Sequence, residues 1–149
     1  MKAYARLTQH WAETAAEMTT IRQDEEALAQ LEAQYGITLP EEFRDYLSCT
    51  CPKDDFCMDW ATAWWPLERI KSVSAEYEGP LKNPIVAANA GSYLFFADFA
   101  IWCYAWAINC GYDEHRGRVV VIGASGDRFV ADCFGAFVDQ FIEDPFSVA

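Results

Sequence analysis

The most hydrophobic stretch of the sequence, Tyr93 to Ile108, limits the folds that are open to this chain. It is shorter than the ~20 residues that a membrane helix needs, and Asp98 interrupts it. We therefore predict two buried strands here, at residues 93–97 and 101–108. In the second strand small and large side chains alternate, as expected when the two faces of a sheet meet different layers.

Helical patterns flank this strand-rich middle. The clearest covers residues 24–35, where Asp24 can act as N-cap and Gly36 follows the last turn. Pro40 is placed in the first turn of a further helix. The predicted helices are 8–18, 24–35, 40–48, 67–77 and a last one that Asp132 caps and Pro145 ends.

The remaining apolar segments are short and are predicted to be strands. The predicted strands are 60–65, 85–88, 93–97, 101–108, 118–122 and 128–131. Helices that precede mostly adjacent strands, with one helix after them, indicate an α+β fold: a largely antiparallel sheet of about five to six strands with helices packed on one side. We expect one domain over residues 1–149, with residues 1–20 as an N-terminal helical extension. The predicted core residues on the helix stripes are Leu31, Phe43, Leu47, Phe134, Phe137 and Phe141.

The charge of the chain is strongly negative, with 23 acidic against 11 basic residues and a net charge of −12. Such a surface repels phosphate backbones and anionic membranes, so we expect neither nucleic acid nor a membrane as partner. It suits a basic protein, although solubility alone would also explain it. The N-terminal segment lacks the apolar region and cleavage site of a signal peptide, so we expect a cytoplasmic protein.

Six cysteines are expected to be reduced thiols, because no secretory signal precedes them. Cys103 lies in an apolar run and is predicted to be a small core residue. Cys49, Cys51 and Cys57 cluster in one loop, but the second pair of ligands that a zinc site needs is missing. We predict no metal site and no cofactor.

No segment supplies a catalytic constellation. The glycines and serine of residues 123–126 have neither the lysine of a phosphate-binding loop nor the spacing of a nucleophile elbow. A Cys–His nucleophile is conceivable, and Cys110 with His115 is the least implausible pair because both lie in one loop. We therefore expect no enzyme activity, with an unrecognised Cys/His-dependent hydrolase or metal-binding enzyme as the alternative.

Three motifs occur in a recognisable order. The first is LEAQYGITLPEEFRDYL at 31–47, and the second is WWPLERIKSVSAEY at 64–77. The third is NAGSYLFFAD at 89–98, followed later by FVADCFGAFVDQFI at 129–142. Together, over residues 24–144, they resemble the SUKH superfamily, which includes the Smi/Knr cell-wall regulators and many bacterial immunity proteins.

The resemblance implies a binding fold rather than an active site. Bacterial relatives typically neutralise toxins, often nucleases, so the implied function is an immunity protein that occludes a cognate toxin. The alternative is a regulatory or scaffold domain that binds an endogenous protein, as the eukaryotic relatives suggest. The chain departs from the family pattern in the Cys- and Asp-rich loop 49–59 and in the aromatic segment 101–108, where partner choice would differ.

We expect the partner to dock on the acidic segment 41–59 and the tryptophans that follow it. Interfaces favour Trp at their centres, and at least one of these tryptophans is expected to be partly exposed. The predicted partner-binding residues are Glu41, Glu42, Asp45, Asp54, Asp55, Asp59, Trp60 and Trp64. The rival surfaces are the loop 109–117 and the aromatic face of 101–108, which could instead join two copies of the chain in a homodimer.

Overall fold

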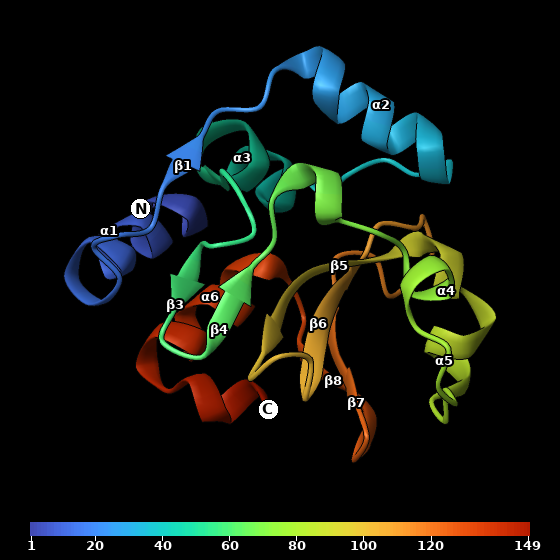
Figure 1. Cartoon of the computed structure of the whole chain (residues 1–149). Coiled ribbons are helices and arrows are strands. Elements are labelled where there is room, and N and C mark those ends of the chain that lie inside the picture. The colour runs from blue at the N-terminus through green and yellow to red at the C-terminus, as the bar shows by residue number, and fades with distance from the viewer.

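The computed structural model describes residues 1–149 and is built on a six-stranded antiparallel sheet (Figure 1). Its strands lie in sequence order, so each connection joins neighbours. They are β3 (Met58–Asp59), β4 (Thr62–Trp64), β5 (Tyr93–Phe99), β6 (Tyr104–Asn109), β7 (Val119–Gly123) and β8 (Gly126–Ala131). A second, two-stranded sheet pairs β1 (Thr20–Ile21) with β2 (Cys51–Pro52).

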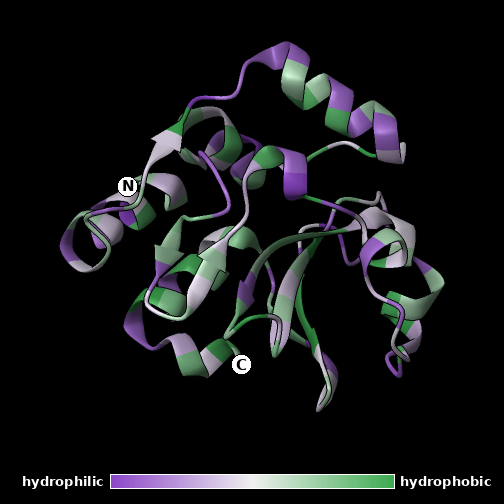
Figure 2. Ribbon diagram, in the orientation of Figure 1, coloured by the Kyte–Doolittle hydropathy of each residue, from purple (hydrophilic) through white to green (hydrophobic).

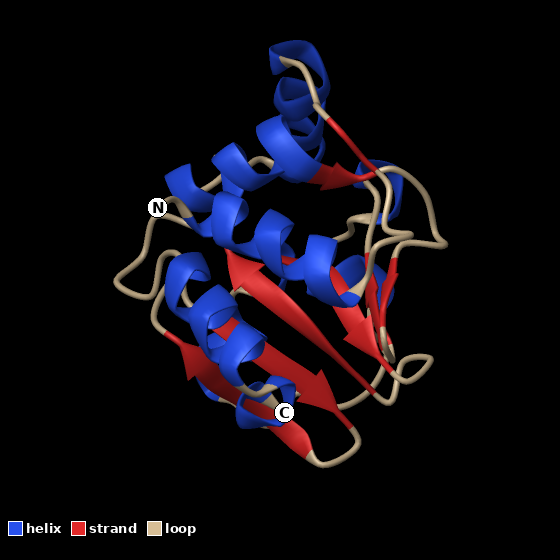
Figure 3. Ribbon diagram, turned by 90° about the vertical axis from the view of Figure 1, so that its left-hand side faces the viewer, coloured by secondary structure: helices blue, strands red, loops and turns tan.

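Most of the longer helices form a layer on one face of the six-stranded sheet, and the helix at residues 25–35 lies above this layer in Figure 1. Figure 3 shows this layer in front of the strands. The helices are α1 (Ala3–Thr14), α2 (Glu25–Tyr35), α3 (Glu41–Thr50), α4 (Val73–Glu76), α5 (Pro84–Ala88) and α6 (Phe134–Glu143), with 3₁₀ turns η1 (Leu67–Arg69), η2 (Ala90–Ser92) and η3 (Pro145–Val148). The short α4 and α5 lie on the side of the sheet away from α6 (Figure 1). The α+β class with an antiparallel sheet is confirmed.

Local signals explain where α2 begins and ends. The Asp24 carboxylate accepts a hydrogen bond from the backbone N–H of Ala27 at 2.8 Å, and Gly36 takes the left-handed conformation at φ 64°. Hydrophilic and hydrophobic residues alternate along this helix in Figure 2, and only Leu28 and Leu31 are buried. The predicted helix 24–35 is therefore confirmed.

One hydrophobic cluster of 35 buried residues joins the helix layer to the sheet. All six predicted core residues belong to it: Leu31, Phe43, Leu47, Phe134, Phe137 and Phe141. Helix α1 contributes Ala3, Leu7 and Trp11, so the N-terminal helix is docked on the rest of the chain. The ring of Trp11 lies edge-on to that of Trp64, with 5.3 Å between their centroids.

Two segments that were predicted to be single elements are divided. Residues 67–77 form η1 and then α4, separated by an extended Ile70. Residues 101–108 form a tight turn up to Cys103, and β6 starts only at Tyr104. Cys103 is consequently exposed, so its prediction as a core residue is wrong.

The predicted strand 85–88 is wrong, because these residues form α5. The side chain of Asn83 accepts a hydrogen bond from the backbone N–H of Ile85, and Pro84 fills the first turn. At α6 the capping side chain is Cys133 rather than Asp132.

The two edges of the six-stranded sheet are β3 and β8. Strand β3 has only two residues. At the start of β8 the Asp127 carboxylate accepts hydrogen bonds from the backbone N–H groups of Lys82 at 3.0 Å and Asn83 at 2.8 Å. This ties the segment before α5 to that edge.

Candidate partner-binding surface

Two of the predicted partner-binding residues are buried and do not lie on the surface. Trp64 is fully buried and packs against Phe141, with 5.2 Å between ring centroids. Asp59 is 6% exposed, and its carboxylate lies 3.0 Å from Nε2 of His10 on α1. Both side chains point into the helix layer, because Asp59 pairs with Thr62 across the two strands and Trp64 lies two residues after Thr62, on the same face.

The predicted acidic residues on α3 lie away from Trp60. Glu41 and Glu42 are exposed in the first turn, and Asp45 pairs with Lys2 at 3.0 Å. Lys2 precedes α1, whereas His10, beside Asp59, lies near its other end, roughly 12 Å further along at 1.5 Å per residue. These acids and Trp60 therefore do not form one compact patch.

The acids of the loop before β3 are only partly free. Asp54 is half-buried, and its carboxylate accepts a hydrogen bond from the backbone N–H of Phe56 at 2.9 Å. Asp55 is exposed and lines a shallow depression with Glu68 and Arg69. The Asp54 carboxylate therefore stabilises the loop, and the Asp55 carboxylate lies in a neighbouring polar depression.

Trp60 is the predicted tryptophan that the structure places on the surface, with 72% of its area exposed. It sits in the turn between β3 and β4. Its ring lies 5.8 Å from Phe99 and 6.0 Å from Phe146 of η3, while Phe99 stacks on Tyr104 at 5.0 Å. Together with Ile101 these residues form a surface that we call the apolar edge.

Ile101 is 97% exposed and lies at the tip of the turn between β5 and β6. The backbone N–H of Ala100 donates to the carbonyl of Ala61 at 2.9 Å, so this turn is joined directly to the turn that carries Trp60. Phe146 is 56% exposed. The apolar edge therefore combines two adjacent turns and the C-terminal 3₁₀ turn.

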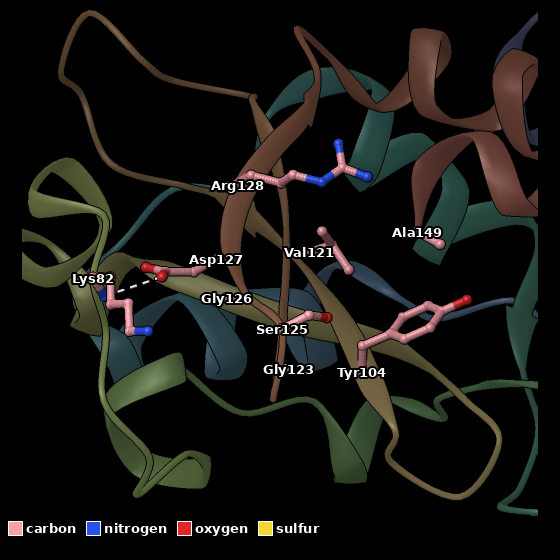
Figure 4. Close-up of a pocket in the computed structure, with 9 residues that line it drawn as sticks. All are labelled: Lys82, Tyr104, Val121, Gly123, Ser125, Gly126, Asp127, Arg128 and Ala149. Carbon is pink, nitrogen blue, oxygen red and sulfur yellow. Dashed lines mark hydrogen bonds between the residues drawn. The ribbon is translucent and has the colours of Figure 1, made fainter.

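Beyond Tyr104 the surface continues into an open pocket of about 360 Å³ (Figure 4). Tyr104 and Val121 line one part of it, and Arg128 of β8 lies above them in the view. Gly123 leaves room for Tyr104, because a Cβ there would lie 2.7 Å from the Cβ of the tyrosine. The apolar edge is therefore adjacent to this pocket, whose lining is more polar.

Acidic side chains border the apolar edge on its helix side. Glu143 and Asp144 directly precede η3, which carries Phe146, and both are exposed. Neither takes part in an ion pair. Glu13 and Asp139 line a shallow depression beside His10 together with Arg6, which pairs with Asp139 at 2.6 Å. We call Glu143 and Asp144 the acidic rim.

The cysteines and histidines form no reactive pair. Cys110 is buried, and this burial raises the pKa of its thiol to about 12, which keeps it protonated at neutral pH. His115 stacks on Phe129 at 5.8 Å, and its Nδ1 lies 3.1 Å from the guanidinium of Arg118. The geometry therefore does not support the Cys110–His115 nucleophile. No group of three or more His, Cys, Asp or Glu side chains is arranged to hold a metal ion.

Ile101 and Phe146 are not among the predicted partner-binding residues. Ile101 begins an apolar run that predicts a strand, with no sign that it lies in a turn. One signal was available for Phe146, since Pro145 ends α6 and leaves the following residue outside its apolar stripe. Nothing in the local sequence marks Ile101 as a turn residue.

Comparison with known proteins agrees with the motif order. None of the helices combines the length and hydropathy of a membrane span. A search of curated proteins finds no match. The model of the SMI1/KNR4 family (SUKH-1) matches residues 23–140, from just before α2 into α6. Helix α1 lies outside this match, which covers most of the chain. The chain therefore belongs to the SMI1/KNR4 family (SUKH-1).

Proposed function

We propose that this chain is an immunity protein that binds a cognate toxin domain, often a nuclease among the bacterial relatives, and neutralises it by occlusion in the cytoplasm. The observation that carries the proposal is the apolar edge, where Trp60, Ile101 and Phe146 are all mostly exposed. Contiguous exposed apolar groups on a folded chain are typical of protein-binding sites. Tryptophan in particular is enriched among residues that dominate binding energy.

The charge supports a basic partner. The chain carries a net charge of −12, and the acidic rim lies beside the apolar edge without ion-pair partners. A nuclease needs a positively charged surface to hold a phosphate backbone, so an acidic protein is attracted to the same surface. Complementary charge would accelerate association, while the apolar contacts would slow dissociation.

Occlusion requires area rather than chemistry. A standard interface buries ~800 Å² on each partner, enough to cover the entrance of an active site. The apolar edge, its acidic rim and the adjoining pocket offer a surface on which such an interface could be centred. A regulatory or scaffold protein would use the same surface on an endogenous partner, and the survival of cells that produce the toxin separates the two readings.

The test is co-expression with the toxin that we expect the adjacent gene to encode, scored as cell survival. We expect the wild-type chain to protect and the double variant Trp60→Ala/Phe146→Ala to lose protection. Tyr112→Ala tests the rival loop 109–117, because Tyr112 is 77% exposed and follows the far end of β6. A triple variant tests the rival acidic surface on α3 and carries Glu41→Lys, Glu42→Lys and Asp45→Lys.

Two results would contradict the proposal. If the double variant protects as well as wild type while the α3 variant does not, the binding surface is on α3 rather than at the apolar edge. If the adjacent gene encodes no toxin, or wild type gives no protection against it, the immunity function itself is wrong.

A further inference from the structure

The turn between β5 and β6 has an unusual backbone. Ala100, Ile101 and Trp102 are successive residues with positive φ, at 50°, 54° and 64°. A β-branched residue in this left-handed region is a strong outlier, since its side chain crowds the backbone. Glycine or asparagine would fit the same conformation with less strain. The chain instead places a nearly fully exposed isoleucine there.

Asp98 holds this turn in place. Its side chain is buried, and Oδ2 accepts a hydrogen bond from the backbone N–H of Trp102 at 2.7 Å. Oδ1 accepts a second hydrogen bond, also at 2.7 Å, from Nε1 of Trp65. The guanidinium of Arg69 lies 3.6 Å away and balances the charge of the carboxylate. The hydrogen bond from Trp102 holds the turn, and the contacts with Trp65 and Arg69 hold the Asp98 carboxylate.

Trp102 provides a second attachment for the turn. Its ring stacks on Tyr77 with 5.9 Å between centroids and meets Phe95 edge-on at 5.1 Å. On the other side of the tip, Ala100 is tied to Ala61. Ile101 is thus the free apex of a turn that is held on both sides, and backbone strain persists only where surrounding structure imposes it.

We propose that Ile101 is a preorganised anchor of the partner interface, which enters an apolar pocket on a basic partner surface, and that Asp98 is its positioning residue. This inference rests on the proposed function. A side chain that is already held in its bound position loses little freedom on binding. The hydrogen bond between Ala100 and Ala61 joins the two turns that carry Ile101 and Trp60, and the unpaired acidic rim favours a basic border around that pocket.

Substitution of Ile101 is expected to raise the stability of the folded chain and to weaken its binding to the partner. Ile101→Asn places a residue that tolerates left-handed backbone at the tip, so the strain is relieved and the folded state gains. We expect the folding equilibrium constant to rise about 5-fold, the lower end of the cost of such strain. The same variant removes the anchor, so the dissociation constant of the complex should rise about 30-fold or more.

A second variant tests the positioning role. Asp98→Asn leaves Ile101 and every surface residue unchanged but weakens the hydrogen bonds that hold the turn. We expect slower association, because fewer molecules present the tip in its binding position, with a smaller loss of affinity than Ile101→Asn. Ile101→Gly repeats the first test without a new polar side chain.

The experiment uses urea unfolding and binding to the purified toxin domain, inactivated at its catalytic site, with Tyr112→Ala for comparison at the rival loop 109–117. Higher stability and weaker binding for both Ile101 variants support the inference. If they bind as wild type does while Trp60→Ala does not, Ile101 is no anchor although the proposed function stands. If they are not more stable, the strain argument is wrong. If wild type does not bind the toxin domain, both proposals are overturned.

Discussion

Phe137 offers the sharpest test of how the last helix docks on the sheet. Its ring is fully buried in α6 and contacts the sheet through Phe96 at 5.3 Å and Trp106 at 5.4 Å between centroids. Three more rings surround it, those of Trp64, Phe134 and Phe141. Because most of these neighbours are fixed by strands or by the same helix, the space left by Phe137→Ala cannot close easily. We expect a loss of about 3–5 kcal/mol of unfolding free energy.

The matched control is Phe146→Ala, which removes a ring of the same size from the surface. Phe146 is 56% exposed, so its truncation should cost under about 1 kcal/mol. Urea unfolding measures both variants, with an unchanged m-value as the sign that only stability differs. For a chain of this size the Phe137 variant should also melt about 6–20 °C lower. A loss below about 1 kcal/mol for Phe137→Ala would show that α6 is not docked as the structure has it.

Two further predictions concern α1 and the buried thiols. Deleting residues 1–22 leaves the family-matched segment but removes Leu7 and Trp11 from the core, so the urea midpoint should fall sharply; an unchanged midpoint would show that α1 contributes nothing to stability. Burial raises the pKa of Cys51 and Cys110 to about 12, above the ordinary value of 9.0, so the folded chain keeps protons that the unfolded chain releases. The free energy of unfolding should therefore fall as pH rises above about 9, by up to about 1.4 kcal/mol per pH unit for each thiol. Cys110→Ala should make this fall less steep. Denaturant titrations that give the same free energy of unfolding from pH 9 to 11 would refute this prediction.

Elements with local signals could be predicted from the sequence. The cap at Asp24 and the left-handed Gly36 define α2 without help from the rest of the fold. The β7–β8 hairpin also follows the prediction, with its strands at 119–123 and 126–131. The predicted strand at 85–88 is wrong because the Asn83–Pro84 pair starts a helix there, although Ile85 and Val86 are residues with high strand propensity.

The candidate site depends on contacts that the sequence does not display. The turn at Ala100–Trp102 has no glycine or asparagine, and it is held by Asp98 through groups far away in the chain, such as Trp65. Trp60 is exposed and Trp64 is buried because β4 begins after Trp60. A shift in the start of this strand would move side chains between the two faces of the sheet. Tertiary packing determines both the conformation of this turn and the start of this strand.

The edge strands of the sheet affect how readily copies of the chain associate with one another. A long open edge strand invites other chains to add to the sheet, and the chain keeps β3 to two residues and ties Asp127 of β8 to the segment before α5. The exposed apolar residues of the apolar edge lie on turns, which do not pair with strands of another chain. Copies of the folded chain at high concentration are therefore less prone to join through their sheets, which is the route to fibrils.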